Sequence, residues 1–138
     1  MVVKGITIHN TGNTLSASSL YQILKKEGHL NYCHYLIDEN EIIETLPVEM
    51  ESHHTGKGYD FGNRFTIAIE ICRSQCNESL YLKAQKRAID FIKELLEKYN
   101  LSKDDIYFHI DFNEQAKCPH RILELYKNKE EFINGNFI

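Results

Sequence analysis

The chain has 138 residues, of which 42% are hydrophobic and 26% are charged, and its formal net charge is -4. This length and composition are typical of one folded domain with its own core, and they exclude a disordered or low-complexity protein. No basic run is long enough to follow a phosphate backbone and no apolar stretch approaches the roughly 20 residues of a membrane span, which argues against nucleic-acid binding and a transmembrane protein.

The start of the chain and its cysteines bear on where the protein is made. Residues 1–5 lack the charged start and apolar middle of a secretory signal, which predicts synthesis in the cytoplasm without a signal peptide. Disulfides form in an oxidising compartment, which a protein without a secretory signal would not enter. Metal binding or catalysis is therefore favoured over disulfide formation for the four cysteines. No zinc-ribbon or thioredoxin spacing is present, and reduced thiols are the simplest interpretation of Cys33, Cys72 and Cys76.

The first half of the chain predicts three strands, one helix and a long loop. Residues 2–9 are rich in β-branched side chains and precede a turn-forming cluster, which indicates a strand. A helix is expected over 16–26, between capping serines and a glycine. Residues 33–37 and 41–46 suit a hairpin with a polar turn. The segment 49–64 has no periodicity and is long for so small a domain, which indicates a functional loop.

The second half alternates strands and helices. Residues 66–72 predict a strand, and residues 80–99 carry apolar side chains every three or four positions, which is typical of an amphipathic helix. A turn is expected at 102–105, a last strand at 106–112, and one or two short closing helices at 121–132.

Alternation along three of the predicted strands gives the sheet one apolar and one polar face, because successive side chains of a strand point to opposite sides. The apolar face is expected to hold Ile6, Ile8, Ile67, Ile69, Ile71, Phe108, Ile110 and Phe112. The opposite face is expected to hold Thr7, His9, Thr66, Ala68, Glu70, Tyr107, His109 and Asp111. Small and polar groups gathered on one face indicate the floor of a site.

His9, His109 and Cys118 are candidate metal ligands within this arrangement. Two imidazoles and one thiolate leave the fourth position of a tetrahedral zinc ion for water or substrate, as in catalytic sites. From spacing alone, ordinary structural histidines are the alternative. Glu70 is costly to bury among small and apolar neighbours unless it has a partner, and an exposed acid on an edge strand is its alternative.

Four blocks, in order, carry a resemblance to a known family. They are Ile6-Thr7-Ile8-His9-Asn10-Thr11, Cys33-His34-Tyr35-Leu36-Ile37-Asp38, Asn63-Arg64-Phe65-Thr66-Ile67-Ala68-Ile69-Glu70, and Phe108-His109-Ile110-Asp111 leading to Lys117-Cys118-Pro119. With these blocks the chain resembles the type 2 N-acetylmuramoyl-L-alanine amidases, which include phage endolysin amidases and share a fold with peptidoglycan recognition proteins. The resemblance implies a single α/β catalytic domain over residues 1–138, with a central mixed β-sheet of about five strands flanked by helices.

The resemblance also implies roles for individual residues. His9, His109 and Cys118 match the family's Zn2+ ligands, Glu70 matches an acidic residue that activates water, and Lys117 matches a lysine that steadies the developing oxyanion. These roles agree with general chemistry, since a bound zinc ion acidifies water, a nearby carboxylate can take its proton, and a cation stabilises a tetrahedral oxyanion.

Substrate-side residues are implied in the long loop and the hairpin. His54 would contact the peptide stem or order the site, and Asn63 would tie the loop to the following strand; with Tyr35 they form the expected substrate-binding set. One departure is Cys33, because some phage members carry a tyrosine near the metal at this position. Alternation places Tyr35 on the Cys33 side and directs Tyr32 away.

The resemblance implies a zinc-dependent hydrolase that cleaves the amide between N-acetylmuramic acid and L-alanine in bacterial peptidoglycan. Such a lytic endolysin or autolysin would act on the cell wall after release, with peptidoglycan as its partner. The rival hypothesis is a non-catalytic peptidoglycan-binding module; such binders typically lack a ligand at the position of Cys118. A disulfide-linked structural protein is a third hypothesis, which would require two bridges and no metal.

Overall fold

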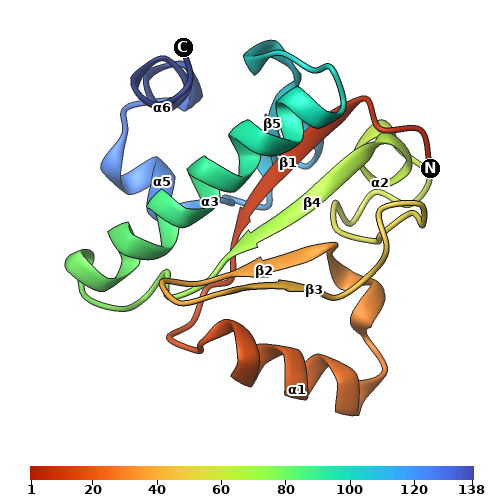
Figure 1. Ribbon diagram of the computed structural model, residues 1–138, viewed down its shortest axis with the longest axis horizontal. Helices are drawn as coiled ribbons and strands as arrows, with labels where there is room; N and C mark the ends of the chain where they lie inside the picture. Colours follow the sequence, from red (N-terminus) through yellow and green to blue (C-terminus); the bar gives the residue numbers. More distant parts are fainter.

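A five-stranded sheet lies at the centre of the computed structural model, which describes all 138 residues (Figure 1). Its strands are β1 (Gly5–Asn10), β2 (Tyr35–Ile37), β3 (Ile42–Glu44), β4 (Thr66–Ile71) and β5 (Ile106–Phe108), in the order β3-β2-β4-β1-β5. β1 pairs in parallel with β4 and β5, β4 pairs in parallel with β2, and β3 is antiparallel to β2. The expected mixed sheet is confirmed, and the carboxyl ends of its four parallel strands point the same way.

The helices are α1 (Ala17–Glu27), α2 (Phe61–Phe65), α3 (Glu78–Lys98), α4 (His109–Phe112), α5 (His120–Leu125) and α6 (Lys129–Asn136), with 3-10 turns η1 (Leu30–Tyr32) and η2 (Lys103–Asp105). α1 begins where the Ser16 side chain accepts a hydrogen bond from the N–H of Ser19, and it ends where Gly28 adopts φ 73°. Asn77 caps the start of α3 in the same way as Ser16 caps α1. These caps satisfy backbone groups that a helix end leaves unpaired. They explain where α1 begins and ends and where α3 begins.

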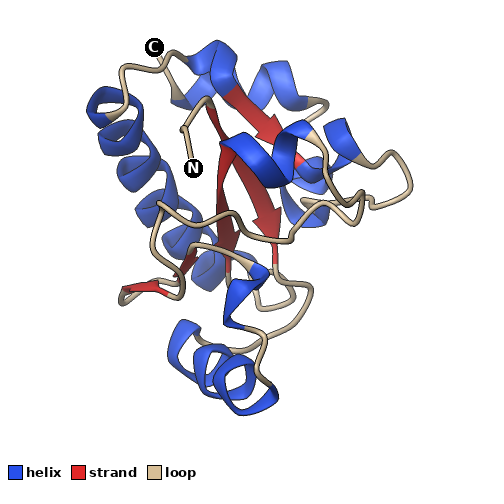
Figure 2. Cartoon of the chain, turned by 90° about the vertical axis from the view of Figure 1, so that its right-hand side faces the viewer, coloured by secondary structure: helices blue, strands red, loops and turns tan.

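The two faces of the sheet are covered by different elements. α3 lies across one face, and α1 lies against the other face at the β2 and β3 side (Figures 1 and 2). The α3 face buries Ile6, Ile8, Ile67, Ile69 and Ile71 completely. Burial of such a side chain contributes about 1.5–3 kcal/mol relative to exposure. The alternation predicted for the first and middle strands is therefore confirmed, and the α3 face forms the main core.

The last strand is shorter than predicted. It ends at Phe108, and residues 109–112 form the single turn of α4, so the expected strand over 106–112 is wrong beyond Phe108. The Asp111 carboxylate accepts the N–H of Phe108 at 2.8 Å, and the N–H of Ile110 donates to the carbonyl of Cys118 at 2.9 Å. Because these groups find partners in the turn and the next loop, the chain leaves the sheet directly before the helix.

The second predicted strand also begins late, at Tyr35. Just before it, the ring of His34 adds to the backbone hydrogen bonds of this residue: Nδ1 accepts the N–H of Ala68 at 2.9 Å and Nε2 donates to the carbonyl of Met50 at 2.7 Å. The predicted loop 49–64 holds the start of α2 but no strand.

None of the helices combines the length and the apolar character needed to cross a membrane.

Candidate metal centre and active site

Three donor side chains meet at the carboxyl ends of β1 and β5. His9 lies near the end of β1, His109 directly follows β5, and Cys118 lies in the loop before α5. One nitrogen of each imidazole and the Cys118 sulfur all lie within 4.8 Å of one another. The Cys118 Sγ lies 3.7 Å from His9 Nδ1, and the two imidazole centroids are 4.7 Å apart. The fold thus brings His9, near the start of the chain, to His109 and Cys118 in its last third.

The donor set fits a zinc ion. Tetrahedral zinc with its usual bond lengths to nitrogen and sulfur separates these two atoms by about 3.5 Å, close to the distance between His9 Nδ1 and Cys118 Sγ. Burial, with the Glu70 charge as a second cause, raises the pKa of the Cys118 thiol to about 12. A cation held between the two imidazoles would offset this cost of ionising the thiol.

Asn10 holds the Cys118 loop in place, a role that sequence analysis missed. Its side-chain oxygen accepts the N–H groups of Arg121 at 2.9 Å and Ile122 at 3.2 Å, and its Nδ2 donates to the hydroxyl of Tyr81 at 3.1 Å. Asn10 is 6% exposed. The signal available in the sequence was an amide side chain directly after the candidate ligand His9.

Glu70 lies beside His9 in the sheet, because the two residues are paired in the register of β1 and β4. Its side chain is buried, and Oε1 has no hydrogen-bond partner. Burial raises the pKa of Glu70 to about 8, while hydrogen bonding with Tyr32 acts in the opposite direction. β4 lies between β2 and β1, so the alternative of an exposed edge-strand acid is wrong. A buried carboxyl oxygen without a partner is uncommon in proteins, and it leaves Glu70 free to bond with a molecule at the site.

The two tyrosines around Cys33 have the opposite orientation to the one predicted. Tyr35 lies on the α3 face with its ring 4.8 Å from that of Phe91, so its expected place at the site is wrong. Tyr32 instead approaches Glu70, whose charge is the largest cause of the raised pKa of Tyr32. Alternation fails here because η1 ends at Tyr32 and β2 begins only at Tyr35.

Cys33 itself is fully buried in the smaller core beneath α1, and its sulfur lies 3.6 Å from Thr45 Oγ1. All four cysteines are free.

His54 and Asn63 are built into the long loop behind the donor cluster. Both are at least 96% buried, and His54 Nδ1 lies 2.9 Å from His9 Nε2. Burial lowers the pKa of His54 to about 4, so its ring is neutral near pH 7. Asn63 Oδ1 accepts the N–H groups of His54 and Thr55 at 2.8 and 3.0 Å, and Nδ2 donates to the carbonyl of Gly58 at 2.7 Å. Asn63 therefore ties the loop to the segment that leads into β4.

Lys117 directly precedes Cys118 and its side chain is exposed, without an ion pair. Its φ of 48° lies in the left-handed region, which costs a non-glycine residue on the order of 1–3 kcal/mol. Backbone strain of this kind persists where surrounding contacts impose it. Lys117 thus stands next to a donor residue in the sequence, with its side chain exposed.

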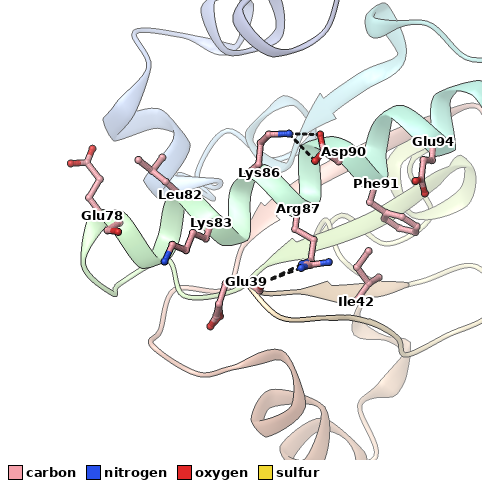
Figure 3. A pocket seen from close by; sticks show the side chains of 11 residues that line it. Glu39, Ile42, Glu78, Leu82, Lys83, Lys86, Arg87, Asp90, Phe91 and Glu94 are labelled. Carbon is pink, nitrogen blue, oxygen red and sulfur yellow. Dashed lines mark hydrogen bonds and ion pairs between the residues drawn. The ribbon is translucent and has the colours of Figure 1, made fainter.

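The donor cluster lies outside the three cavities of the molecule, since none is lined by His9, Glu70, His109 or Cys118. The largest cavity, about 890 Å³, lies between α3 and the β2–β3 hairpin (Figure 3). Lys86 pairs there with Asp90 at 2.7 Å, and Arg87 donates to the carbonyl of Glu39. The donor cluster lies instead at the carboxyl ends of β1 and β5, where His9 is buried and His109 and Cys118 are partly exposed.

Solved structures share this fold over nearly the whole chain. The structure of PlyL matches with a TM-score of 0.91 at 29% identity, covering 100% of this chain and 86% of that one. The catalytic domain of XlyA matches with a TM-score of 0.85 at 30% identity, covering 98% of this chain and 86% of that one.

Sequence comparison gives the family. The N-acetylmuramoyl-L-alanine amidase CwlA of Bacillus subtilis (strain 168) is 36% identical over 124 residues, which cover 89% of this chain and 45% of CwlA. XlyB, an N-acetylmuramoyl-L-alanine amidase of the same organism, is also 36% identical, and the match covers 39% of its length. The chain thus spans less than half the length of these curated relatives. The model of the N-acetylmuramoyl-L-alanine amidase family matches residues 1–121, and the chain belongs to this family.

Proposed function

We propose that this chain is a zinc-dependent hydrolase that cleaves the amide bond between N-acetylmuramic acid and L-alanine in bacterial peptidoglycan. The observation that carries the proposal is the close approach of the His9, His109 and Cys118 donor atoms. Beside them lies the buried carboxyl group of Glu70, one oxygen of which has no hydrogen-bond partner. Membership of the amidase family supports the substrate and the bond. Residues 1–138 would form the catalytic domain of a cell-wall lytic enzyme that acts on the wall after release.

The mechanism assigns a separate task to each residue. His9 and His109 would hold zinc through neutral imidazole nitrogens and Cys118 through its thiolate. Bound zinc would supply a Lewis acid that polarises the amide carbonyl and acidifies water. Glu70 takes a proton from the attacking water and passes it to the L-alanine nitrogen as the C–N bond breaks. The ammonium group of Lys117 supplies positive charge for the oxygen that becomes negative.

The test is a product assay on purified peptidoglycan with the zinc-loaded protein. New amino groups of L-alanine are the expected product, and release of reducing sugar ends instead would contradict the proposed bond. Binding to peptidoglycan without any cleavage would favour the non-catalytic module. The Cys118→Ser variant should lose both zinc, measured by elemental analysis, and turnover, since it removes the thiolate donor.

A further inference from the structure

The ring of His54 lies between a donor residue and a backbone carbonyl. His54 Nδ1 is 2.9 Å from His9 Nε2, and His54 Nε2 is 3.0 Å from the carbonyl oxygen of Gly62. The rings of His54 and His9 meet edge to face, with an interplanar angle of 82°. Both nitrogens of His54 are thus engaged inside the protein, and its side chain is 4% exposed. No nitrogen of this ring is left to bind a substrate.

The positions of the protons follow from this arrangement. A carbonyl oxygen only accepts hydrogen bonds, so the Nε2 of the neutral His54 ring carries the proton and donates to Gly62. His54 Nδ1 is then an acceptor, and His9 must donate to it from Nε2–H. Nδ1 of His9 is left with its lone pair free. This is the nitrogen that lies 3.7 Å from the sulfur of Cys118.

The backbone carbonyl of Gly62, at the end of this chain of hydrogen bonds, is held in position by further contacts. The hydroxyl of Thr66 also donates to the Gly62 oxygen, at 2.7 Å, and lies 2.7 Å from the hydroxyl of Thr7. Gly62 has no room for a side chain, because a Cβ there would lie 2.5 Å from Thr55 Cγ2 and 2.9 Å from Phe112 Cδ2. The position of the Gly62 carbonyl is therefore imposed by β1, β4 and α4 together.

His109 is held by the same loop in a simpler way. Its Nε2 lies 2.9 Å from the carbonyl oxygen of Thr55, which fixes the proton on Nε2 and leaves Nδ1 free. Asn113 donates to the same carbonyl at 3.1 Å. Hydrogen bonds to the far nitrogen of a ligating histidine orient the ring and raise its affinity for the metal.

We propose that His54 is a positioning residue that selects Nδ1 of His9 as the metal-binding nitrogen, and that the loop from His54 to Gly62 acts as the outer support of the metal centre. This inference rests on the proposed zinc site, and it goes beyond it by assigning His54 to the metal rather than to the peptide stem. Removal of the acceptor at His54 leaves the His9 Nε2–H unpaired in a buried place and allows its ring to change tautomer.

Two variants of His54 separate this role from general packing. In His54→Asn, the side-chain oxygen stands where Nδ1 stood and can still accept from His9. In His54→Leu, the shape is roughly kept and the acceptor is lost. We expect the zinc dissociation constant, measured by competition with a chelator, to rise about 10–100-fold in His54→Leu and to stay within about 5-fold in His54→Asn. His53→Leu, at the exposed neighbouring residue, is the matched control and should bind zinc like the wild type.

A second measurement is independent of these variants. Imidazole 15N NMR of the metal-free wild type at neutral pH should show the His9 proton on Nε2. A proton on Nδ1, or undiminished zinc affinity in a folded His54→Leu protein, would overturn the proposal. If His54→Leu does not fold, the NMR result on the wild type decides. Because neither readout uses cleavage, a protein that fails to release L-alanine amino groups can still pass this test.

Discussion

The two faces of the central sheet come from the same strands, yet they differ in what their side chains contact. On the α3 face, the isoleucines of β1 and β4 belong to the main apolar core. On the opposite face, Thr7, His9 and Glu70 stand at alternating positions of the same two strands, and the loop 49–64 covers the part that α1 leaves free. The α3 face carries the larger apolar core, whereas the opposite face combines the smaller core beneath α1 with buried polar groups. Substitutions should therefore separate stability from activity according to face.

The largest expected effect is on the polar face. Glu70→Gln removes the proposed proton acceptor while keeping the volume of the side chain, so turnover of peptidoglycan should fall about 10²–10⁴-fold. Zinc content and the circular dichroism spectrum should stay as in the wild type. Near-normal turnover would show that another group takes the proton.

The matching change on the apolar face is Ile69→Ala, one position away on the same strand. Ile69 is fully buried, so the substitution should lower the free energy of unfolding by about 2–5 kcal/mol, measured by urea denaturation. Turnover of the remaining folded protein should be nearly unchanged. The control is Ile42→Ala on β3, where the side chain is 36% exposed and the loss should be much smaller.

A smaller effect is expected where the loop meets the polar face. Gly62→Ala would place a Cβ against Thr55 and Phe112, which should cost about 1–3 kcal/mol of unfolding free energy and weaken zinc binding as the carbonyl shifts. Gly135→Ala is the matched control, because a Cβ there meets open space within α6 and should slightly stabilise the helix. If the two variants had the same unfolding free energy and zinc affinity, the loop around Gly62 would be able to accommodate a Cβ without cost.

The smallest expected effect concerns pH in the metal-free protein. Burial raises the pKa of Glu70 from 4.5 to about 8, so the folded state keeps a proton that the unfolded state loses as pH rises through this interval. This group therefore makes stability decrease with rising pH. Glu70→Gln removes that contribution, so its stability relative to the wild type should increase by about 1 kcal/mol between pH 5 and pH 6. A constant difference across this range would contradict the shifted pKa.

The faces of regular strands, where side chains alternate, could be predicted most accurately from the sequence. Ile67, Ile69 and Ile71 define one face of β4, and the opposite face then follows for Glu70 without any knowledge of the fold. The caps of α1 were equally readable, because Ser16 and Gly28 act within one turn of the helix. Local rules thus give most of the elements.

The failures lie where contacts outside the regular helix and strand patterns decide the local structure. Strand β5 stops at Phe108 because Asp111 and the Cys118 carbonyl satisfy the backbone beyond it. Tyr32 and Tyr35 exchange their expected faces because the chain between them is neither helix nor strand. The proposed role of His54 depends on the backbone carbonyl of Gly62. The position of a backbone carbonyl cannot be predicted from residue types.

Retention of a zinc ion would also affect resistance to proteases, because one loop supports both His109 and His54. Its Thr55 carbonyl holds His109 and its Gly62 carbonyl holds His54, so zinc bound at the cluster would stabilise the loop as well as its own ligands. A ligand that binds only the folded state at about 100 times its dissociation constant adds about 2.7 kcal/mol of stability. Without zinc the loop would lose this stabilisation, and we expect proteases to cleave it more readily than in the zinc-bound protein.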